Sequence, residues 1–241
     1  MTDLLRVQDI HTYYGLSHVL HGVSIEVHQG EVVCLLGRNG AGKTTTIRSV
    51  MGLTPPARGR VLVFDQPVQD LPPYKIFRMG VRWIPQGRRI FPMLSVEENI
   101  RLALVQSRTD NEAAEIDRVF DMFPVLREKR KDRAGTLSGG QLQMAAIARA
   151  LIGDPKLILM DEPTEGLAPL IIQGIAQVIL SIKAGGTTVL LAEQNLPMAL
   201  AVADRHYIID QGQIRFQGTG RELEDNEEIK TAYLGVARET D

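Results

Sequence analysis

The most constraining feature of this sequence is an apolar run that stops at a glycine-rich loop and continues as helix-forming sequence. The run is Val-Val-Cys-Leu-Leu at residues 32–36, and the loop after it has the pattern G-x-x-x-x-G-K-[ST]. In strand–loop–helix order this pattern predicts a phosphate-binding P-loop. The P-loop residues are Gly37, Arg38, Asn39, Gly40, Ala41, Gly42, Lys43, Thr44 and Thr45. Because glycines let backbone N–H groups approach an anion and the helix N-terminus is positive, we expect nucleotide phosphates to bind here.

A second apolar run ends in two acidic residues. Residues 157–160, Leu-Ile-Leu-Met, precede Asp161 and Glu162, the arrangement called Walker B. Asp161 can hold Mg²⁺ directly or through water, and the Thr44 hydroxyl is expected to be another ligand. Glu162 can orient and polarise a water molecule for attack on a γ-phosphate, while Lys43 is expected to reach the β- and γ-phosphates. The two acids could instead cap the next helix, but their position after a P-loop favours the catalytic interpretation.

Two glutamines also follow predicted strands. Gln86 ends the segment 81–86, and Gln194 comes shortly after the apolar segment 187–192. Since parallel strands place their carboxyl ends at one edge of a sheet, we expect both side chains to lie beside the P-loop and the two acids. Gln86 is expected to contact Mg²⁺ and the attacking water. Gln194 is expected to donate a hydrogen bond to a γ-phosphate oxygen, because an amide donates without carrying charge.

Strand-like and helix-like segments alternate along most of the chain, which predicts an α/β fold with a mainly parallel sheet covered on both faces. Residues 4–10 and 23–27 alternate apolar and polar side chains and are expected to form an N-terminal antiparallel β subdomain. From Ser95, which begins a capping-box sequence, helical periodicity replaces the strand signal. We therefore expect one domain over residues 1–241, with a helical subdomain at about 95–153 inserted in the core.

Composition narrows the possible partners. The 241 residues are 23% charged with a formal net charge of −2, so no basic field favours nucleic acid, and we expect no nucleic-acid partner.

One apolar stretch, residues 167–182, carries Gln173, Gln177 and Ser181 at four-residue spacing. This spacing indicates an amphipathic helix that is also short for a membrane span. Any membrane contact is therefore expected to go through a partner protein.

Residues 137–141, Leu-Ser-Gly-Gly-Gln, form a second glycine-rich helix start that is suited to binding phosphate. In a chain that already has a P-loop, a second anion site makes sense for the nucleotide of another subunit. The order P-loop, Gln86, residues 137–141, Asp161-Glu162 and Gln194 resembles the ATP-binding cassette (ABC) ATPases over essentially the whole chain. The resemblance implies the ABC ATPase fold of a P-loop NTPase with a RecA-like core, ATP and Mg²⁺ as cofactors, and ATP hydrolysis.

The same resemblance implies a head-to-tail dimer with a second copy or with a different cassette subunit. Each ATP would lie between the P-loop of one subunit and the 137–141 segment of the other. The residues of this segment expected to contact ATP are Ser138, Gly139, Gly140 and Gln141. Tyr14 is expected to stack on adenine, with Tyr13 as the alternative and core packing of either ring as a further possibility. Gln86 would lie on the loop that communicates with a membrane partner, and the helical subdomain would face that partner.

Two positions depart from the common ABC pattern. Gln194 stands where the family usually has a histidine, and Ala168 replaces the aspartate of the loop after Walker B. Glutamine can still donate a hydrogen bond to a phosphate oxygen but carries no charge. We therefore expect these two departures to affect the rate of ATP hydrolysis and not the binding of ATP.

Several segments resemble one of the two ATPase subunits of bacterial branched-chain amino acid importers. They are Tyr-Tyr-Gly at 13–15, Pro-Gln-Gly-Arg-Arg-Ile-Phe-Pro at 85–92, Glu-Gly-Leu-Ala-Pro at 165–169 and Ala-Glu-Gln-Asn at 192–195. The resemblance implies uptake of branched-chain, hydrophobic amino acids with two transmembrane permease subunits and, indirectly, a periplasmic solute-binding protein. It also implies a peripheral location on the cytoplasmic face of the inner membrane. The similar urea and short-chain amide importer subunit is the alternative.

Two other classes of function are less favoured by the sequence. A soluble ABC ATPase of translation usually has two cassettes in one chain, whereas this chain has one. A repair ATPase needs a long coiled coil, and this sequence has no heptad run that would form one. A non-enzymatic, nucleotide-gated module is disfavoured because Lys43, Asp161 and Glu162 are all present, although Gln194 favours it weakly.

Overall fold

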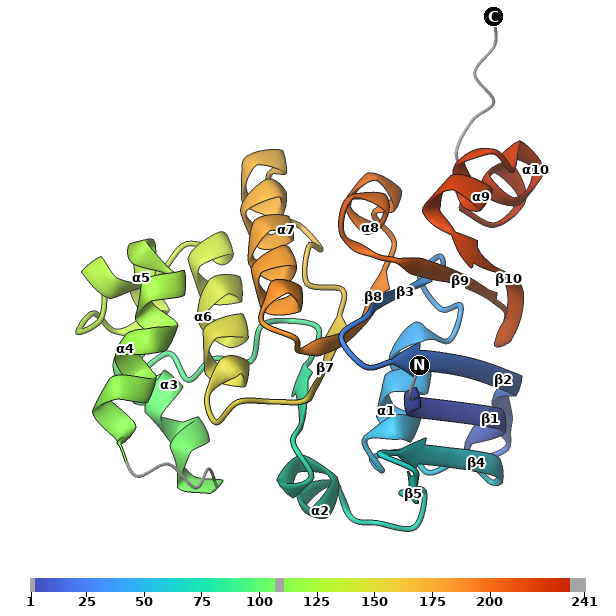
Figure 1. Ribbon diagram of the computed structural model, residues 1–241, viewed down its shortest axis with the longest axis horizontal. Coiled ribbons are helices and arrows are strands. Elements are labelled where there is room, and N and C mark those ends of the chain that lie inside the picture. Colours follow the sequence, from blue (N-terminus) through green and yellow to red (C-terminus); the bar gives the residue numbers. More distant parts are fainter. Residues whose placement is uncertain (1–2, 107–110, 235–241) are drawn as a thin grey trace, which may run out of the picture.

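The computed structural model describes residues 3–106 and 111–234, so the domain expected over residues 1–241 extends beyond the described part. Two β-sheets and the helices that cover them make up the structure (Figure 1). The antiparallel sheet contains β1 (Asp3–Tyr14), β2 (Ser17–His28), β4 (Arg58–Val63) and β5 (Gln66–Pro67). The second sheet contains β3 (Val32–Leu36), β6 (Val81–Ile84), β7 (Leu157–Asp161), β8 (Thr188–Glu193), β9 (Arg205–Asp210) and β10 (Gln213–Thr219).

The second sheet is mainly parallel, as predicted. Its strand order is β10-β9-β3-β8-β7-β6, and only the hairpin strand β10 runs antiparallel to its neighbour. Every residue of β3, β7 and β8 is buried, which is typical of strands that are covered on both faces. Because β3, β8 and β7 are neighbours, the segments that follow them leave the sheet side by side at one edge.

Alternate side chains of β3 contribute to two hydrophobic cores. Val33 and Leu35 lie in the core between the two sheets, together with apolar residues of α1 (Lys43–Val50). Val32, Cys34 and Leu36 lie in the core on the opposite face, beneath the helices. This division follows from the two-residue period of a strand, which sends successive side chains to opposite faces.

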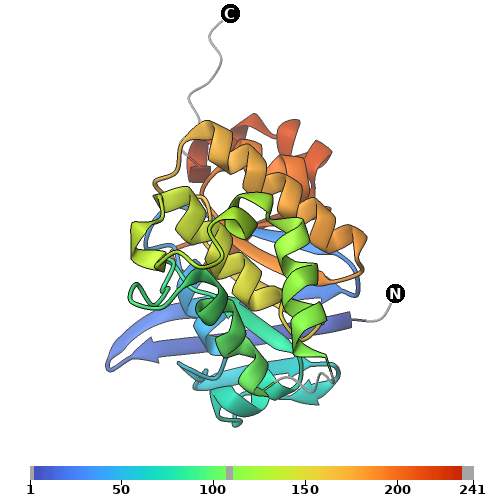
Figure 2. The same cartoon turned by 90° about the vertical axis from the view of Figure 1, so that its left-hand side faces the viewer.

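The remaining helices surround the second sheet. They are α2 (Pro73–Arg78), α3 (Val96–Arg101), α4 (Glu112–Met122), α5 (Pro124–Glu128), α6 (Gly139–Leu151), α7 (Pro169–Ala184), α8 (Leu196–Val202), α9 (Gly220–Glu224) and α10 (Glu227–Ile229), with the short turns η1 (Leu102–Gln106), η2 (Ala134–Thr136) and η3 (Lys230–Leu234). Helices α3 to α6 gather at the end of the molecule farthest from the antiparallel sheet (Figures 1 and 2). The predicted capping box is present at the start of α3, where the side chains of Ser95 and Glu98 bond to each other's backbone N–H groups.

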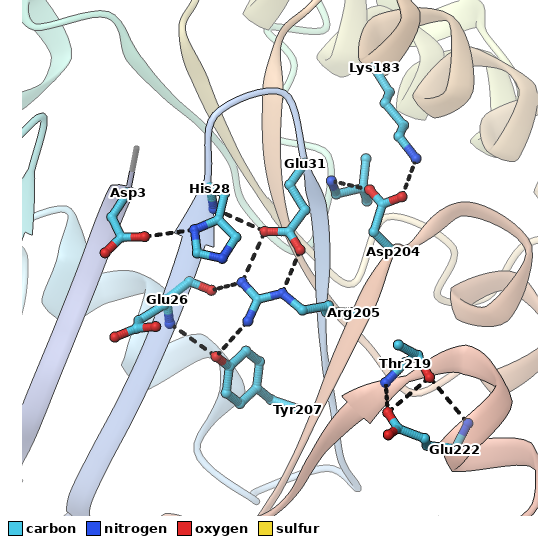
Figure 3. Close-up of polar contacts among 11 residues, drawn as sticks. Asp3, Glu26, His28, Glu31, Lys183, Asp204, Arg205, Tyr207, Thr219 and Glu222 are labelled. Atoms are coloured by element: carbon cyan, nitrogen blue, oxygen red, sulfur yellow. Dashed lines mark hydrogen bonds and ion pairs between the residues drawn. The ribbon is translucent and has the colours of Figure 1, made fainter. Parts of the chain in front are cut away.

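A polar network joins the two sheets at the amino end of β3, opposite the P-loop (Figure 3). Arg205 on β9 donates to the Glu31 carboxylate and to the Glu26 carbonyl oxygen, each at 2.9 Å through Nη2. The His28 N–H donates to the same Glu31 carboxylate at 2.9 Å, and the Tyr207 hydroxyl accepts from the Glu26 N–H at 3.2 Å. The Glu31 carboxylate raises the pKa of Arg205 above its usual value, so the guanidinium stays charged.

The C-terminal segment 221–234 contains three short helical pieces, because Asn226 caps a new helix soon after Thr219 has capped the one before it. The helix expected from residue 167 begins at Pro169, since Gly166 adopts a left-handed φ of 66° in the preceding loop. Within residues 3–106 and 111–234, no helix is both long enough and apolar enough to cross a membrane.

Candidate nucleotide-binding site

The P-loop follows β3 with the backbone shape that its glycines allow. Gly42, at the N-cap of α1, has a φ of 117°, a conformation that residues with a Cβ rarely adopt. A Cβ at Gly37 would lie 2.4 Å from the Ile209 carbonyl oxygen, so β9 packs against the start of the loop. The first N–H groups of a helix have no acceptor within it, and here no side chain caps them. No side-chain cap therefore competes with an anion at the start of α1, and phosphate binding there stays a prediction.

Lys43 is held inside the site by oxygen atoms of its own chain. Its side chain is 3% exposed, and Nζ donates to the carbonyl oxygens of Gly37 at 2.6 Å and Arg38 at 3.0 Å. The same Nζ forms an ion pair with Glu162 Oε1 at 2.9 Å. A phosphate that enters the P-loop would compete with these oxygens for the ammonium group.

Asp161 lies at the end of β7 beside the P-loop helix. Its Oδ1 accepts from the Thr44 hydroxyl at 2.9 Å, whereas its Oδ2 is buried without a hydrogen-bond partner. Burial raises the pKa of Asp161 to about 6, although the hydrogen bond from Thr44 opposes this change. An unpaired buried oxygen next to a hydroxyl fits a hard cation such as Mg²⁺, which prefers oxygen ligands. The described residues contain no cluster of three or more His, Cys, Asp or Glu suited to a metal, so such a cation would need further ligands from a nucleotide or water.

Glu162 lies between Lys43 and Gln86. Its Oε2 is 3.4 Å from Gln86 Nε2, and the same amide donates to Glu165 Oε2 at 2.8 Å. Glu162 has a φ of 48°, a left-handed conformation that is uncommon for a residue with a side chain. A pocket of about 310 Å³ opens beside it, lined by Glu162, Thr164, Glu165, Gly166, Leu167, Ile172, Glu193, Gln194 and Asn195.

Gln194 lines the same pocket as Glu162 and is exposed. The structure thus brings it to the site edge that the strand order predicted, next to the loop after β7. The sequence analysis missed its neighbour Glu193, which is 2% exposed and accepts hydrogen bonds from Thr164, Gln194 and Asn195. The signal in the sequence was an acidic residue directly after an apolar strand, as at Asp161, but only the structure shows that Glu193 faces inward.

The 137–141 segment begins α6 and has no hydrogen bond or ion pair to the P-loop among the described residues. The Ser138 side chain accepts from the Gln141 N–H at 3.3 Å, and the Gln141 side chain accepts from the Ser138 N–H at 2.9 Å. A Cβ at Gly140 would lie 2.7 Å from Ile171 of α7, whereas Gly139 faces the flexible side chain of Arg88. Part of this motif is therefore explained by packing within the chain.

The two tyrosines at the end of β1 differ in their contacts. The Tyr13 ring stacks on His18, with centroids 4.2 Å apart and an interplanar angle of 8°. Tyr14 is 45% exposed and has no stacked ring among the described aromatic contacts. Because Tyr13 is also 38% exposed, core packing is wrong as an explanation for either ring. Adenine stacking by Tyr14, with Tyr13 as the alternative, stays a prediction.

Comparison with known proteins agrees with this geometry. The family model of the ABC transporter matches residues 20–165, which span the P-loop, Gln86, the 137–141 segment and both acids. The chain belongs to the ABC transporter ATPases. This family hydrolyses ATP, and the high structural similarity described next confirms the predicted fold class.

Three similar proteins illustrate the family. The branched-chain amino acid transport ATP-binding protein BraG of Pseudomonas aeruginosa is 43% identical over 96% of this chain and 100% of its own length. The lipopolysaccharide export ATP-binding protein LptB of Escherichia coli is 37% identical over 96% of this chain and 97% of its own. A solved ATP-binding cassette of an ABC transporter in its ADP conformation is 31% identical with a TM-score of 0.82, covering 98% of this chain and 96% of that one. ABC ATPases of this kind bind adenine nucleotides and work with membrane transporters.

Proposed function

We propose that this ABC ATPase is the MgATP-hydrolysing subunit of a bacterial importer for branched-chain amino acids. The observation that carries the hydrolytic part is the contact of Lys43 with Glu162 and of Thr44 with Asp161. Four groups from two distant segments thus form one site at the carboxyl edge of the sheet. The similarity to BraG supports the solute class, whereas the similarity to LptB makes lipopolysaccharide export the second candidate.

The proposed roles follow from the chemistry of each group. The P-loop N–H groups and Lys43 bind the phosphates, since they offer the positive potential that an anion needs. Thr44, Asp161 and Gln86 would hold Mg²⁺, which would supply positive charge that neutralises the phosphates. Glu162 orients the attacking water by accepting a hydrogen bond from it, and Gln194 donates a hydrogen bond to a γ-phosphate oxygen.

A second ATPase subunit completes the site in this proposal. Residues 138–141 lie at the start of α6 without a partner in the P-loop of their own chain, which supports their use on the nucleotide of another subunit. Two permease subunits would receive the energy of hydrolysis, and a periplasmic binding protein would deliver the solute to them. The protein would then lie peripherally on the cytoplasmic face of the inner membrane.

Solute uptake in the source bacterium tests the proposal. Deleting the gene should lower the uptake of radiolabelled leucine at micromolar concentration, and the wild-type gene should restore it. Glu162→Gln should fail to restore uptake, whereas Glu228→Gln makes the same chemical change at an exposed residue of α10 and should restore it. Normal leucine uptake in the deletion strain, with reduced lipopolysaccharide at the cell surface, would assign the chain to export instead.

A further inference from the structure

Glu193 has an unusual environment for a carboxylate. It is the last residue of β8 and is 2% exposed, and its side chain accepts every hydrogen bond described for it. Oε1 accepts from the Thr164 N–H at 3.0 Å and from the Thr164 hydroxyl at 2.7 Å. Oε2 accepts from the N–H groups of Gln194 at 3.0 Å and Asn195 at 3.2 Å. The two oxygens therefore divide their bonds between two different loops.

The two loops are those that carry the reacting groups of the proposed site. Thr164 lies two residues after Glu162, in the loop between β7 and α7, while Gln194 begins the loop between β8 and α8. Each loop lines the 310 Å³ pocket. The carboxylate of Glu193 thus links the loop that follows Glu162 to the loop that begins at Gln194.

The backbone at the end of β8 also bonds to the P-loop and to Glu162. The Gly37 N–H donates to the Glu193 carbonyl oxygen at 3.3 Å, and the Glu162 N–H donates to the Ala192 carbonyl oxygen at 2.9 Å. These bonds do not depend on the side chain of Glu193. A change of that side chain should therefore alter the two loops while leaving the P-loop attached to β8.

Glu162 itself has an uncommon backbone conformation, with a left-handed φ of 48°. A residue with a Cβ holds such a conformation only where its surroundings determine it, and such residues cluster at functional sites. Here the Glu162 N–H donates to the Ala192 carbonyl oxygen, the Glu165 N–H donates to the Glu162 carbonyl oxygen, and Glu193 anchors Thr164. Loss of the Thr164 anchor would therefore remove one of three contacts that hold this loop.

We propose that Glu193 is a positioning residue for ATP hydrolysis, whose buried carboxylate fixes the loop of Glu162 relative to the loop of Gln194. The inference rests on the proposed function, because it assigns Glu193 to the reaction that Glu162 performs. Burial raises the pKa of Glu193, and the four donated bonds oppose that change. A carboxylate is suited to the position because it only accepts hydrogen bonds, and all four neighbouring groups are donors.

Glu193→Gln is the direct test because it keeps the size of the side chain. Its NH₂ group would face N–H donors of one loop and could not accept from them. We expect kcat for ATP to fall about 10- to 100-fold, which corresponds to losing about one hydrogen bond to a charged group. The KM for ATP should stay within about twofold, since the P-loop keeps its bond to the Glu193 carbonyl oxygen.

Glu31→Gln is the matched control. Glu31 is also a largely buried carboxylate that accepts several hydrogen bonds, but it lies at the opposite end of the sheet in the network of Figure 3. The Glu31→Gln variant should have a lower melting temperature than the wild type and the same kcat. An equal loss of kcat in both variants would overturn the proposal, because a general loss of stability would then explain it. Wild-type kcat in Glu193→Gln would overturn it as well.

Thr164 provides a second test that does not alter Glu193. Thr164→Ser keeps the hydroxyl and should keep kcat, whereas Thr164→Val removes the 2.7 Å bond and should lower kcat. If Glu193 acts through Thr164, the double variant Glu193→Gln/Thr164→Val should lose less than the product of the single losses. Independent, multiplicative losses would contradict the proposal. A wild-type protein without ATPase activity would instead refute the proposed function, so the two failures are distinguishable.

Discussion

Two helices of this ABC ATPase begin at a glycine-rich loop, and the two starts are built differently. At α1 the N-cap is Gly42, no side chain caps the helix, and the buried Lys43 lies inside the loop. At α6 the N-cap is Ser138, whose capping box with Gln141 already satisfies two backbone groups, and Ser138 is exposed. No side chain caps the first start, whereas the second is capped by a serine and a glutamine of its own. This difference fits the proposal that the first start binds the chain's own nucleotide and that the second serves the nucleotide of another subunit.

The largest expected effect comes from removing the charge of the first site. Lys43→Ala should lower kcat/KM for ATP by about 10²–10³-fold, because the phosphates lose a preorganised cation. Steady-state ATPase measurement checks this, with Lys75→Ala on the exposed face of α2 as the control. Wild-type turnover in Lys43→Ala would contradict the assignment of the P-loop, and with it the difference between the two helix starts.

Glu162→Gln tests whether the second start serves another subunit. The amide keeps the shape of the carboxylate but cannot polarise water, so hydrolysis should fall by at least about 10²-fold while ATP still binds. The trapped ATP should then hold a dimer that size-exclusion chromatography with light scattering detects.

Adding Ser138→Glu to Glu162→Gln should restore the monomer, because a carboxylate at the start of α6 would repel the triphosphate of the other subunit. A monomeric Glu162→Gln protein at saturating MgATP would count against the shared site. A wild-type chain that pairs weakly with itself would not, because the natural partner could be a different cassette subunit.

Gly140→Ala tests how much the second start contributes to packing within the chain. The added Cβ would meet Ile171 at 2.7 Å, so we expect the free energy of unfolding to fall by about 1–3 kcal/mol. Gly139→Ala is the control on the same helix turn, since its Cβ would meet only the movable guanidinium of Arg88. Urea denaturation of the isolated chain without nucleotide measures both. Equal stability of the two variants would show that α7 yields to the larger residue.

Gln194→Ala has the smallest expected effect and sharpens the account of the first site. Losing one neutral hydrogen bond in the transition state should cost about 1–2 kcal/mol, or roughly a 5- to 30-fold drop in kcat, with little change in ATP affinity. Steady-state ATPase beside Glu162→Gln measures it. A rate equal to that of the wild type would show that Gln194 takes no part in hydrolysis. A rate as low as that of Glu162→Gln would show that Gln194 does more than donate one positioning hydrogen bond.

Much of the site could be predicted because its signals are local in the sequence. The buried runs before Gly37 and Asp161 predict strands through their unbroken apolar character, and the loop after β3 needs glycines for its own backbone conformation. Since parallel strands end at one edge, the meeting of Lys43 and Glu162 follows from these same signals.

Other features depend on contacts that no local pattern encodes. The close approach of Ile209 to Gly37 requires β9 to be the neighbour of β3, and the approach of Ile171 to Gly140 requires α7 to pack against α6. The stacking of Tyr13 on His18 depends on the register of β1 with β2. Each of these pairs is separated in the sequence, so neither partner alone reveals the contact.

The sequence by itself determined the P-loop, the strand ends and the family to which this ABC ATPase belongs, because glycine conformation, apolar periodicity and motif order are properties of short segments. The tertiary structure decided that Glu193 points inward and joins the loops of Glu162 and Gln194. The physical reason is that a buried carboxylate takes its role from the donors around it, and the two donors of Thr164 reach Glu193 only when β7 and β8 lie side by side.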